Sequence, residues 1–568
     1  MQIVTPKQMQ RIEEMSEKMG VSKKQLMENA GKALADLIDN YCRSEIGGIY
    51  EGRSVVFLTG KGNNSGDCFV AASILVYRGY SITIIDIGGQ PESELAREMY
   101  GRLPQERVNF IDGYRNKTVE AAIEAAELEY MSVAGADLSE LENKKDRNPI
   151  DNILLHEQRR MQKVTEAVRE ADVLVDGVYG TGFHGQLDKN ISAVFSIGTS
   201  AYCIAVDVPS GGNCVSGTAA QGIFKADETL TFGYIKTGMS QFPLKKYCGK
   251  ITIADIGLPD GVIKITDDER KYFRIERNHL ASFPPKRERD SHKGHFGKVL
   301  VIAGSSSMRG AAAFASLGAL RSGTGIVRLA SVEKCIDTAA TLVPEATYIE
   351  LECDDYGHML FDPNRDMILK AMKQADAIVI GCGMGVTQDT IELTKFVTEN
   401  ADCPVVIDAD GINCIACDID ILVKKKSEVV ITPHSGEMAR LLNCETQMIN
   451  DNRIVVAEKY AEKYDITVVL KGAGTVVANN RNTAVNHTGN AGMSVGGSGD
   501  VLAGIIGSII SQGLNVFDSA CAGVYMHGLA GDAAAEKLGM EAMLPRDIIA
   551  NLPDSFRLLK EKKKNMNG

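Results

Sequence analysis

Short runs of β-branched and aliphatic residues alternate with longer segments of helical character along almost the whole chain. In the first half we expect strands at 54–59, 81–86, 172–176, 202–207 and 229–232. In the second half we expect them at 298–303, 325–330, 377–380, 404–408, 428–431 and 466–470. Strands that alternate with helices form parallel sheets covered on both faces. This alternation therefore predicts two α/β domains.

A proline pair followed by a run of charges separates the two halves, at Pro284-Pro285-Lys286-Arg287-Glu288-Arg289-Asp290. A chain of 568 residues has room for at least two domains. We expect a first domain over 1–275, a linker over 276–290 and a second domain over 291–568.

Two stretches stand outside this plan, and both are rich in charge. The segment 127–160 is expected to be a surface insertion, and the lysine-rich tail at 560–564 a frayed end in solvent. The thirteen cysteines are too sparse for a disulfide scaffold. The single CxxC pattern, Cys414–Cys417, has no second pair nearby, so we expect buried thiols rather than a zinc or redox site.

The charge balance of the chain bears on its partners. Lys and Arg number 62 and Asp and Glu 74, which gives a formal net charge of −12. Nucleic-acid-binding proteins usually carry a basic footprint. No apolar run is long enough to span a membrane, and the first residues lack the apolar region of a signal peptide. We expect a cytoplasmic homo-oligomer with small-molecule substrates and neither nucleic acid nor membrane as a partner.

Three strand ends in the first half carry glycines and polar side chains. The first is the loop Gly60-Lys61-Gly62-Asn63-Asn64-Ser65-Gly66-Asp67, which brings backbone N–H groups to a helix start and could cradle a phosphate. It matches neither a Walker loop nor GxGxxG. Asp176 and Asp207 close the other two strands. One such Asp is more often a helix cap, but three converging strand ends offer oxygen ligands to a hard cation.

The strongest pattern of the second half is the glycine-rich segment 490–500, which ends in Gly496-Gly497-Ser498-Gly499-Asp500 and leads into an apolar helix. Clustered N–H donors stabilise the charge that develops in phosphoryl transfer. Asp500 is placed to act as a general base, although an Asp at a helix start also serves as a cap. His434, Lys471 and the loop 381–385 follow neighbouring strands and could join the same site.

Together these motifs resemble the bifunctional NAD(P)HX epimerase/dehydratase family over nearly the whole chain. The motifs that match its epimerase domain are LMENAG (26–31), GKGNNSGD (60–67), DGVYGTG (176–182), VDVPSG (206–211) and TFG with Lys236. Those that match its dehydratase domain are HKGHFG (292–297), MRGAA (308–312), ALRSG (319–323), DAD (408–410), TPHSGE (432–437), LKGAGT (470–475), GGSGD (496–500) and HG (527–528). The resemblance implies a Rossmann-like three-layer αβα domain followed by a ribokinase-like αβα domain.

For the first domain, the resemblance implies a site for the hydrated dinucleotide, with Asp207 as the catalytic residue against the nicotinamide ring. The implied substrate contacts are Asn63, Asn64, Ser65, Gly66, Asp67, Gly180, Thr181, Gly182, Phe183, His184, Gly185 and Asp207. It also implies a potassium ion held by Asn64, Asp176 and Ser210. The family loop usually reads NNGGDG, so Ser65 and Cys68 depart from it.

For the second domain, the resemblance implies that Asp500 is the base that deprotonates the C6 hydroxyl of the substrate. The other implied substrate contacts are Ala311, Gly383 and His434, and the implied ADP contacts are Lys471, Gly472, Ala473, Gly474, Thr475 and Gly499. Mg²⁺ is expected for charge neutralisation. The sequence departs from the family at GCGMG, usually GPGLG, and at Ser498, where Thr is commoner.

The function predicted in this way is the repair of hydrated nicotinamide cofactors. The first domain would interconvert R- and S-NAD(P)HX, and the second would dehydrate the S epimer with ADP, giving NAD(P)H, AMP and phosphate. Two alternatives stay open: a ribokinase-fold small-molecule kinase, and a first domain that binds a ligand without catalysis.

Overall fold

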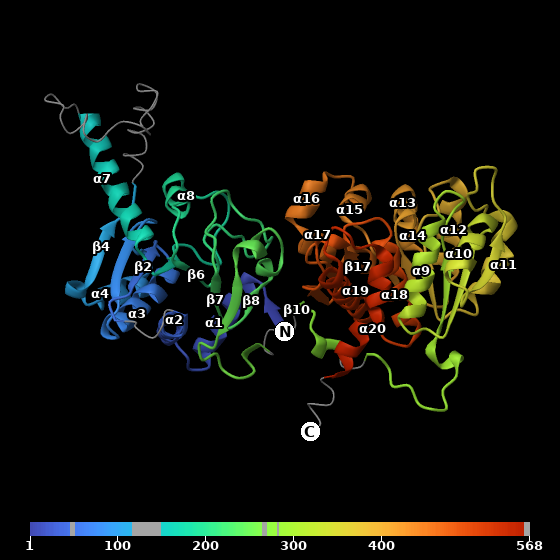
Figure 1. The fold of residues 1–568 in the computed structure, drawn as a ribbon, viewed down its shortest axis with the longest axis horizontal. Helices are drawn as coiled ribbons and strands as arrows, with labels where there is room; N and C mark the ends of the chain where they lie inside the picture. Colours follow the sequence, from blue (N-terminus) through green and yellow to red (C-terminus); the bar gives the residue numbers. More distant parts are fainter. Residues whose placement is uncertain (46–50, 116–148, 264–269, 281–282, 562–568) are drawn as a thin grey trace. The chain divides into compact units, whose positions relative to one another are not determined.

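The computed structural model describes residues 1–45, 51–115, 149–263, 270–280 and 283–561 (Figure 1). The chain divides into two compact units, Ile3–Asp268 and Met1–Gln2 with Glu269–Gly568. The functional boundaries at 275 and 291 remain a prediction. No helix within the described residues is both long and apolar enough to cross a bilayer.

The first unit is built on a parallel sheet with the strand order β4-β3-β2-β5-β6-β7-β9. Its strands are β2 (Ser54–Thr59), β3 (Ser81–Asp86), β4 (Val108–Asp112), β5 (Val173–Gly177), β6 (Tyr202–Val206), β7 (Glu228–Phe232) and β9 (Lys250–Ala254). Outside this sheet, β1 (Gln2–Val4) pairs in parallel with β8 (Ile235–Lys236). The order reverses between β2 and β5, and ligands bind at such switch points, beyond the carboxyl ends of the strands.

Two apolar cores cover the two faces of this sheet, because successive side chains of a strand point to opposite sides. Val55 and Phe57 belong to one core, and Val56 and Leu58 belong to the other. The first core includes residues of α1 (Pro6–Lys18), α2 (Lys23–Glu45), α3 (Asn63–Tyr77) and α4 (Glu94–Gly101). The second includes residues of α7 (Pro149–Arg169) and α8 (Lys189–Phe195). The unit therefore has the three predicted layers.

The sheet of the second unit runs in the order β13-β12-β11-β14-β15-β16-β17-β18-β19-β10. The strands are β10 (Lys271–Arg274), β11 (Lys298–Ile302), β12 (Ile326–Val332), β13 (Thr347–Leu351), β14 (Ala377–Ile380), β15 (Val405–Ile407), β16 (Val429–Ile431), β17 (Thr467–Leu470), β18 (Val476–Ala478) and β19 (Asn482–Val485). Strands β14 to β17 are buried at every position, as expected for strands covered on both faces.

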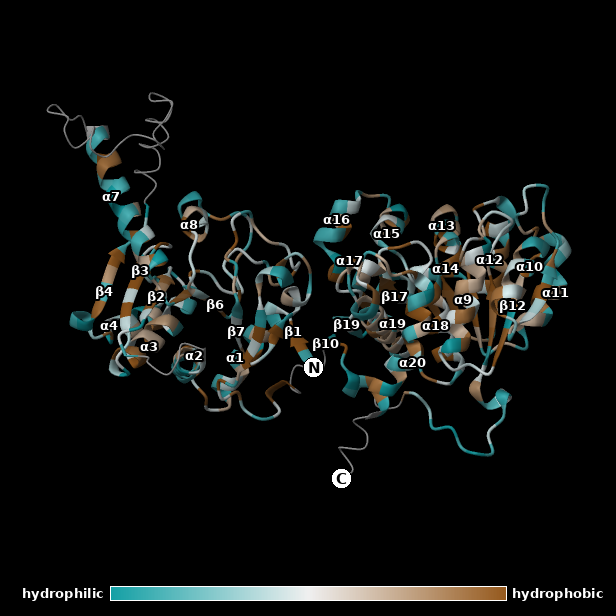
Figure 2. Cartoon of the chain, in the orientation of Figure 1, coloured by the Kyte–Doolittle hydropathy of each residue, from teal (hydrophilic) through white to brown (hydrophobic). Residues whose placement is uncertain are grey.

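Figure 2 shows strands such as β4 and β12 in apolar brown and the surface helix α16 (Thr446–Asp451) largely in teal.

The helices of the second unit complete its layers. They are α9 (Arg309–Arg321), α10 (Glu333–Leu342), α11 (Arg365–Met372), α12 (Gln388–Asn400), α13 (Asp410–Cys417), α14 (Asp420–Val423), α15 (Ser435–Leu442), α16, α17 (Arg453–Tyr464), α18 (Ser498–Ser511), α19 (Val516–Leu538) and α20 (Pro545–Glu561). Helices α9 and α18 pack against each other and on strands β11 and β14. The prediction of two α/β domains is confirmed.

The purely parallel sheet predicted for the second half is wrong at one place. Strands β17, β18 and β19 pair antiparallel. The turn at Asn479–Arg481 is too short for a crossover connection, which needs a dozen or more residues.

The segment 127–160, predicted to be a surface insertion, is partly integral to the fold. Its part up to 148 lies outside the described residues, but from Pro149 the chain forms α7, and Glu157 and Arg160 are buried. Of the lysine-rich tail, 562–564 lie outside the described residues, and Lys560 falls in the last turn of α20.

Phe283 and Arg287 of the predicted linker pack on the second unit. Phe283 is buried, and the guanidinium of Arg287 lies 3.9 Å from the centre of the Phe296 ring. All thirteen cysteines are free. The expectation of buried thiols at the CxxC pattern holds for Cys414, whereas Cys417 is exposed.

Candidate active sites

The loop that was predicted to cradle a phosphate in the first unit leads into the start of α3. The helix begins at Asn63 directly after the loop that follows β2, and its N-cap Gly62 supplies no side-chain hydrogen bond. The Ser65 hydroxyl lies 2.7 Å from both the N–H and the carbonyl oxygen of Gly60, so it closes the turn. Cys68 is wholly buried. Both departures from the usual family loop are thus accommodated inside the protein.

Asn64, Asp176 and Ser210 come together at the carboxyl ends of the strands, as their positions predicted. The Asp176 carboxylate accepts hydrogen bonds from the Ser210 hydroxyl at 2.6 Å and the Ser210 N–H at 2.7 Å. The Asn64 amide donates to the carbonyl oxygens of Tyr179 and Val206 at 3.1 and 2.8 Å. The cluster therefore joins one carboxylate to amide, hydroxyl and carbonyl oxygens.

The electrostatics of this cluster favour a cation. Asp176 is wholly buried, and burial raises its pKa to about 6. Within the described residues, only the N–H and O–H groups of Val178 and Ser210 stabilise its charge. A hard monovalent ion would supply the missing positive charge, and the oxygen donors fit it.

The second feature of this site is a buried ion pair at the end of β6. The Lys236 ammonium, 1% exposed, contacts the Asp207 carboxylate and donates to the Thr231 hydroxyl at 2.9 Å. Phe232 N–H also donates to Asp207, at 3.2 Å. The backbone of Asp207 takes a φ of 64°, a conformation that is uncommon outside glycine and is often found at functional sites.

Two more carboxylates share the field of this ion pair. Burial and the charge of Asp207 raise the pKa of Glu13, and burial with the charges of Asp207 and Glu13 raises the pKa of Asp67. One lysine thus faces three acidic groups, which favours retention of a proton among them. Glu13 lies on α1 and belongs to no motif, so sequence reasoning missed it.

The other predicted substrate contacts of the first unit lie in the loop that follows β5. These residues are Gly180, Thr181, Gly182, Phe183, His184 and Gly185. Gly180 packs against Asn64, since a Cβ at this glycine would lie 2.6 Å from the Asn64 Oδ1. The rings of Tyr179 and Phe183 lie 5.2 Å apart.

In the second unit, Asp500 lies in the first turn of α18 and faces Asp408 at the end of β15. Ligand atoms of Asp500, Asp408 and Cys382 lie within 4.8 Å of one another. Burial, followed by the charge of Asp408, raises the pKa of Asp500 to about 7. A carboxyl group with such a pKa is suited to general base catalysis near neutral pH.

Lys471 is the cation of this site. Its ammonium lies 2.7 Å from an Asp408 oxygen and 3.8 Å from a Glu437 oxygen. Burial acts to lower the pKa of Lys471, but the charges of Asp408 and Glu437 outweigh it and raise this pKa. Thr432 also donates to Asp408, at 2.6 Å. Asp408 belongs to the motif DAD, but the sequence pattern predicts no site role for it; its position at the end of a buried strand is the feature that indicates one.

Further predicted residues surround this cluster. A Cβ at Gly499 would lie 3.2 Å from the Lys471 ammonium, and one at Gly383 would lie 2.8 Å from the Ala311 Cβ, so each pair is in contact. Gly472, Ala473, Gly474 and Thr475 form the loop after β17, where the Thr475 hydroxyl donates to the Gly472 carbonyl at 2.9 Å.

His434 has a structural contact and an accessible ring. Its Nδ1 accepts hydrogen bonds from the Gly436 and Glu437 N–H groups, which caps α15. Its side chain is 52% exposed. Burial and the charge of Lys471 lower its pKa, which favours the neutral imidazole.

A phosphate cradle at the switch point of one sheet, together with a carboxylate–lysine cluster at a glycine-rich helix start in another, defines a two-site α/β enzyme for nucleotide substrates. The family model described as YjeF-related protein N-terminus matches residues 23–238. The one described as NAD(P)H-hydrate dehydratase matches residues 299–554.

The relatives of the chain match over its whole length. A bifunctional NAD(P)H-hydrate repair enzyme of Moorella thermoacetica is 32% identical, with 94% of this chain and 93% of the relative covered. The Escherichia coli enzyme of the same description is 30% identical, covering 95% and 90%. The chain belongs to the family of bifunctional NAD(P)H-hydrate repair enzymes, which confirms the predicted family, fold class and enzyme class.

A solved structure is similar to the second half of the chain. It is the ADP/ATP-dependent NAD(P)H-hydrate dehydratase of Bacillus subtilis, co-crystallised with ATP and Mg²⁺. The identity is 28%, the TM-score is 0.44, and 50% of this chain and 98% of that chain are covered.

Proposed function

We propose that the first domain interconverts the R and S epimers of NADHX and NADPHX, and that the second domain dehydrates the S epimer with ADP. The observation that supports this proposal most directly is the Asp500 carboxylate, with a pKa near 7, at the glycine-rich start of α18. The full-length match to relatives described as bifunctional repair enzymes supports the pairing of the two activities.

In the dehydratase domain, Asp500 takes the proton of the C6 hydroxyl. The hydroxyl oxygen then forms a bond to the terminal phosphorus of ADP, and the bond to the bridging oxygen breaks to release AMP. The backbone N–H groups at Gly497–Asp500 stabilise the transferring phosphoryl. Loss of phosphate from C6 and of a proton from C5 then restores the double bond of NAD(P)H.

The residues around Asp500 fit a divalent cation. Asp408, Asp500 and Glu437 lie near one lysine, so negative charge is in excess. Carboxylate oxygens are the ligands that Mg²⁺ prefers, and Asp408 and Asp500 offer them; the Cys382 thiol is too soft to take part. When bound, Mg²⁺ would neutralise phosphate charge during the transfer. The predicted ADP contacts at 471–475 and 499 remain part of this proposal.

In the epimerase domain, Asp207 is the group that removes and returns a proton. Epimerisation requires a bond at C6 to break and to re-form on the other face, and the C6 hydroxyl proton must move as this occurs. Lys236 holds the Asp207 carboxylate in place. Glu13 and Asp67, whose pKa values are raised, provide a nearby proton reserve. K⁺ held by Asn64, Asp176 and Ser210 would fix the loops that carry the substrate contacts.

The test is to incubate the full chain with mixed NADHX epimers and ADP and to follow NADH absorbance. We expect complete recovery of NADH, with one AMP formed per NADH. A stable phosphorylated product without NADH would support the small-molecule kinase instead. Recovery limited to the S epimer would support a first domain that binds without catalysis. The cytoplasmic location and the homo-oligomeric state remain predictions.

A further inference from the structure

The cradle in the first domain continues into the ends of β3 and β4. Gly88 follows β3, and its N–H donates to the Thr59 carbonyl at 3.0 Å. A Cβ at Gly88 would lie 2.8 Å from the Gly60 Cα, and one at Gly89 would lie 2.8 Å from the Lys61 Cε. The loop after β3 is therefore packed directly against the cradle, on the side away from Asp207 in the strand order.

Asp86, the last residue of β3, has an unused hydrogen-bonding group. Its Oδ2 accepts from the exposed Gln90 amide at 2.6 Å, and the Gly89 backbone N–H acts to lower the pKa of the carboxyl, whereas Oδ1 is buried and has no partner at hydrogen-bonding geometry among the described residues. Burial raises the pKa of this carboxyl to about 6. A buried oxygen without a donor is costly, so a ligand that displaces the exposed Gln90 side chain and donates hydroxyl groups to Asp86 would stabilise this oxygen.

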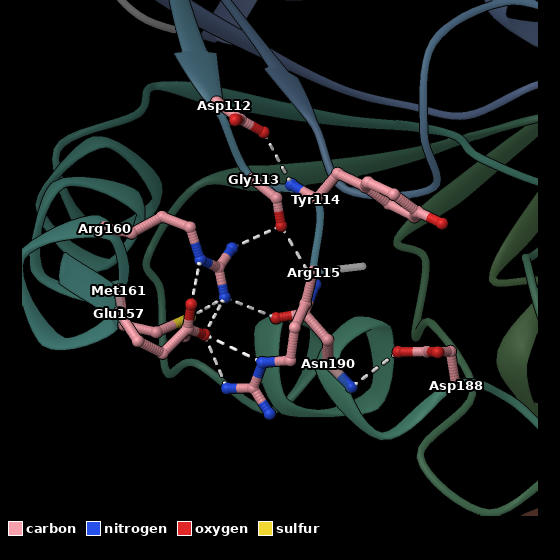
Figure 3. A network of polar contacts seen from close by, with 9 residues as sticks. All are labelled: Asp112, Gly113, Tyr114, Arg115, Glu157, Arg160, Met161, Asp188 and Asn190. Carbon is pink, nitrogen blue, oxygen red and sulfur yellow. Dashed lines mark hydrogen bonds and ion pairs between the residues drawn. The ribbon is translucent and has the colours of Figure 1, made fainter. Parts of the chain in front are cut away.

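Tyr114 presents an exposed ring beside the same loop. Its side chain is 39% exposed, and the Lys61 ammonium lies 5.9 Å from the ring centre. Figure 3 shows this ring pointing away from the polar network that holds the segment 113–115. Gly89 also approaches it, since a Cβ there would lie 3.4 Å from the Tyr114 Cε2.

The network in Figure 3 fixes the segment that carries Tyr114. Arg160 of α7 donates to the Gly113 carbonyl and, at 2.6 Å, to the Asn190 side chain; the Asn190 amide in turn donates to Gly113 at 2.9 Å. Arg115 and Arg160 both pair with Glu157. The backbone of residues 113–115 is thus tied to α7 and α8, which fixes the point from which the Tyr114 ring projects.

We propose that Asp86 and Tyr114 form an adenosine subsite of the epimerase domain that selects NADHX over NADPHX. In dinucleotide-binding α/β folds, an acidic residue about 20 positions after the glycine-rich loop accepts a hydrogen bond from the ribose 2′-hydroxyl. Asp86 occupies the corresponding position, because it ends β3 and follows Gly66 of the glycine-rich loop by 20 residues. The adenine stacks on Tyr114, and the nicotinamide extends from the cradle toward Asp207.

The charges around the subsite oppose a 2′-phosphate. Asp112 of β4 is the register partner of Asp86, so two carboxylates stand at neighbouring strand ends. Lys61 already pairs with Glu92 at 2.8 Å. NADPHX would therefore place its phosphate next to Asp86 and Asp112, where the single Lys61 charge is already shared between Glu92 and Asp86, whereas NADHX offers hydroxyl donors. This inference rests on the proposed epimerase function.

The experiment uses the full chain without ADP, so that only epimerisation proceeds. R-enriched NADHX and NADPHX are supplied separately, and the epimers are resolved by chromatography. We expect the wild type to prefer NADHX in kcat/KM by roughly tenfold or more. Asp86→Asn should lower that ratio about tenfold, mainly through KM. Glu106→Gln, the same loss of charge at the opposite end of β4, should leave it unchanged.

Tyr114 gives a second readout that does not depend on Asp86. Tyr114→Ala should raise KM for both substrates alike, and Tyr114→Phe, which keeps the ring, should restore wild-type values. Equal kcat/KM for both substrates in the wild type, or an unchanged ratio in Asp86→Asn, would overturn the subsite while leaving the epimerase function intact. A wild type that interconverts neither substrate would overturn the proposed function and the subsite with it.

Discussion

Asp500 is the residue on which the dehydratase proposal depends most. As a cap it would accept a hydrogen bond from the start of α18, yet within the described part of the chain no backbone N–H donates to it and the helix has no side-chain cap. Its raised pKa instead reflects burial beside Asp408. The structure therefore favours a chemical role over the capping alternative.

Asp500→Asn should lower ADP-dependent NADH recovery by roughly 10²–10⁴-fold, the usual contribution of a positioned acid–base group. Epimerisation should not change, because it uses a separate site. The melting temperature at pH 8 should be equal or higher, since the amide removes a buried charge. Near-normal dehydration would exclude Asp500 as the base. A large fall in melting temperature would support a structural role for Asp500 as a helix cap.

The pKa of Asp500 also sets a pH dependence. The base is active when ionised, and its pKa is raised to about 7, so kcat/KM for dehydration should fall about tenfold per pH unit below 7. The free energy of unfolding changes with pH in the opposite direction. The raised pKa of Asp500 contributes stability at low pH, and this contribution is lost as the pH rises through 7. A flat kcat/KM profile between pH 6 and 8 would contradict the assignment.

Asp176 tests the proposed potassium site. Asp176→Asn keeps the shape of the side chain but removes its charge, so the K⁺ concentration needed for half-maximal epimerisation should rise at least about tenfold. Dehydration of S-NADHX should be spared. Asp172→Asn, a change at the other end of β5, is the matched control. Epimerisation independent of K⁺ in the wild type would show that the cluster is structural.

Sequence reasoning found the residues that close buried strands and missed those that reach a site from elsewhere. Asp176 and Asp500 stand beside glycines, and Asp207 stands four residues before Gly211, all at strand ends or helix starts where the pattern is local. Glu13 lies on α1, and the sequence pattern of this segment indicates only an amphipathic helix. The pairing of Lys471 with Asp408 joins residues 63 positions apart, which no single-sequence pattern encodes.

At the scale of elements, the close packing of α18 on α9 constrains the second unit at one glycine. A Cβ at Gly504 would lie 2.0 Å from the Ala315 carbonyl oxygen. Because this neighbour is backbone, it cannot move aside as a side chain could. The two helices approach each other at this glycine and bring Ala311 and Asp500 to the same sheet edge.

Gly504→Ala should therefore lower the free energy of unfolding of the second domain by about 1–3 kcal/mol or more. Gly310→Ala is the control in the facing helix: its Cβ would lie 4.0 Å from the nearest side-chain atom, and the change should be neutral or gain up to ~1 kcal/mol. Urea unfolding of both variants measures the difference. Equal stability would mean that the helices can separate at little cost.

The strands found from the sequence are mostly the central ones. β2, β3 and β14 have the predicted bounds, because buried parallel strands are continuous apolar runs. β4, β9 and β13 were not predicted, and each stands at the edge of its sheet with exposed or half-buried positions. β18 and β19 were not predicted either; they are internal and largely buried, but they are only three and four residues long. An edge strand has less apolar surface to bury, so its pattern does not differ from that of a loop.

At the scale of the molecule, the division of the chain into two compact units predicts that the two activities can be separated. The fragment from Glu269 should fold alone and dehydrate only the S epimer, leaving the R epimer to slow spontaneous change. A fragment from Ser282 lacks β10, which pairs with β19 over four residues, and should melt at a lower temperature. Full conversion of both epimers by either fragment would contradict the division of labour.

The distribution of thiols has a consequence for chemical damage. The thiolate is the form that oxidants and alkylating agents attack. Burial and the charges of Asp500 and Asp408 raise the pKa of Cys382 well above its usual value, so the thiol within the dehydratase cluster stays protonated and inert. Cys353 and Cys417 are exposed and take up such reagents first. Surface oxidation can therefore accumulate while the chemistry of both sites persists.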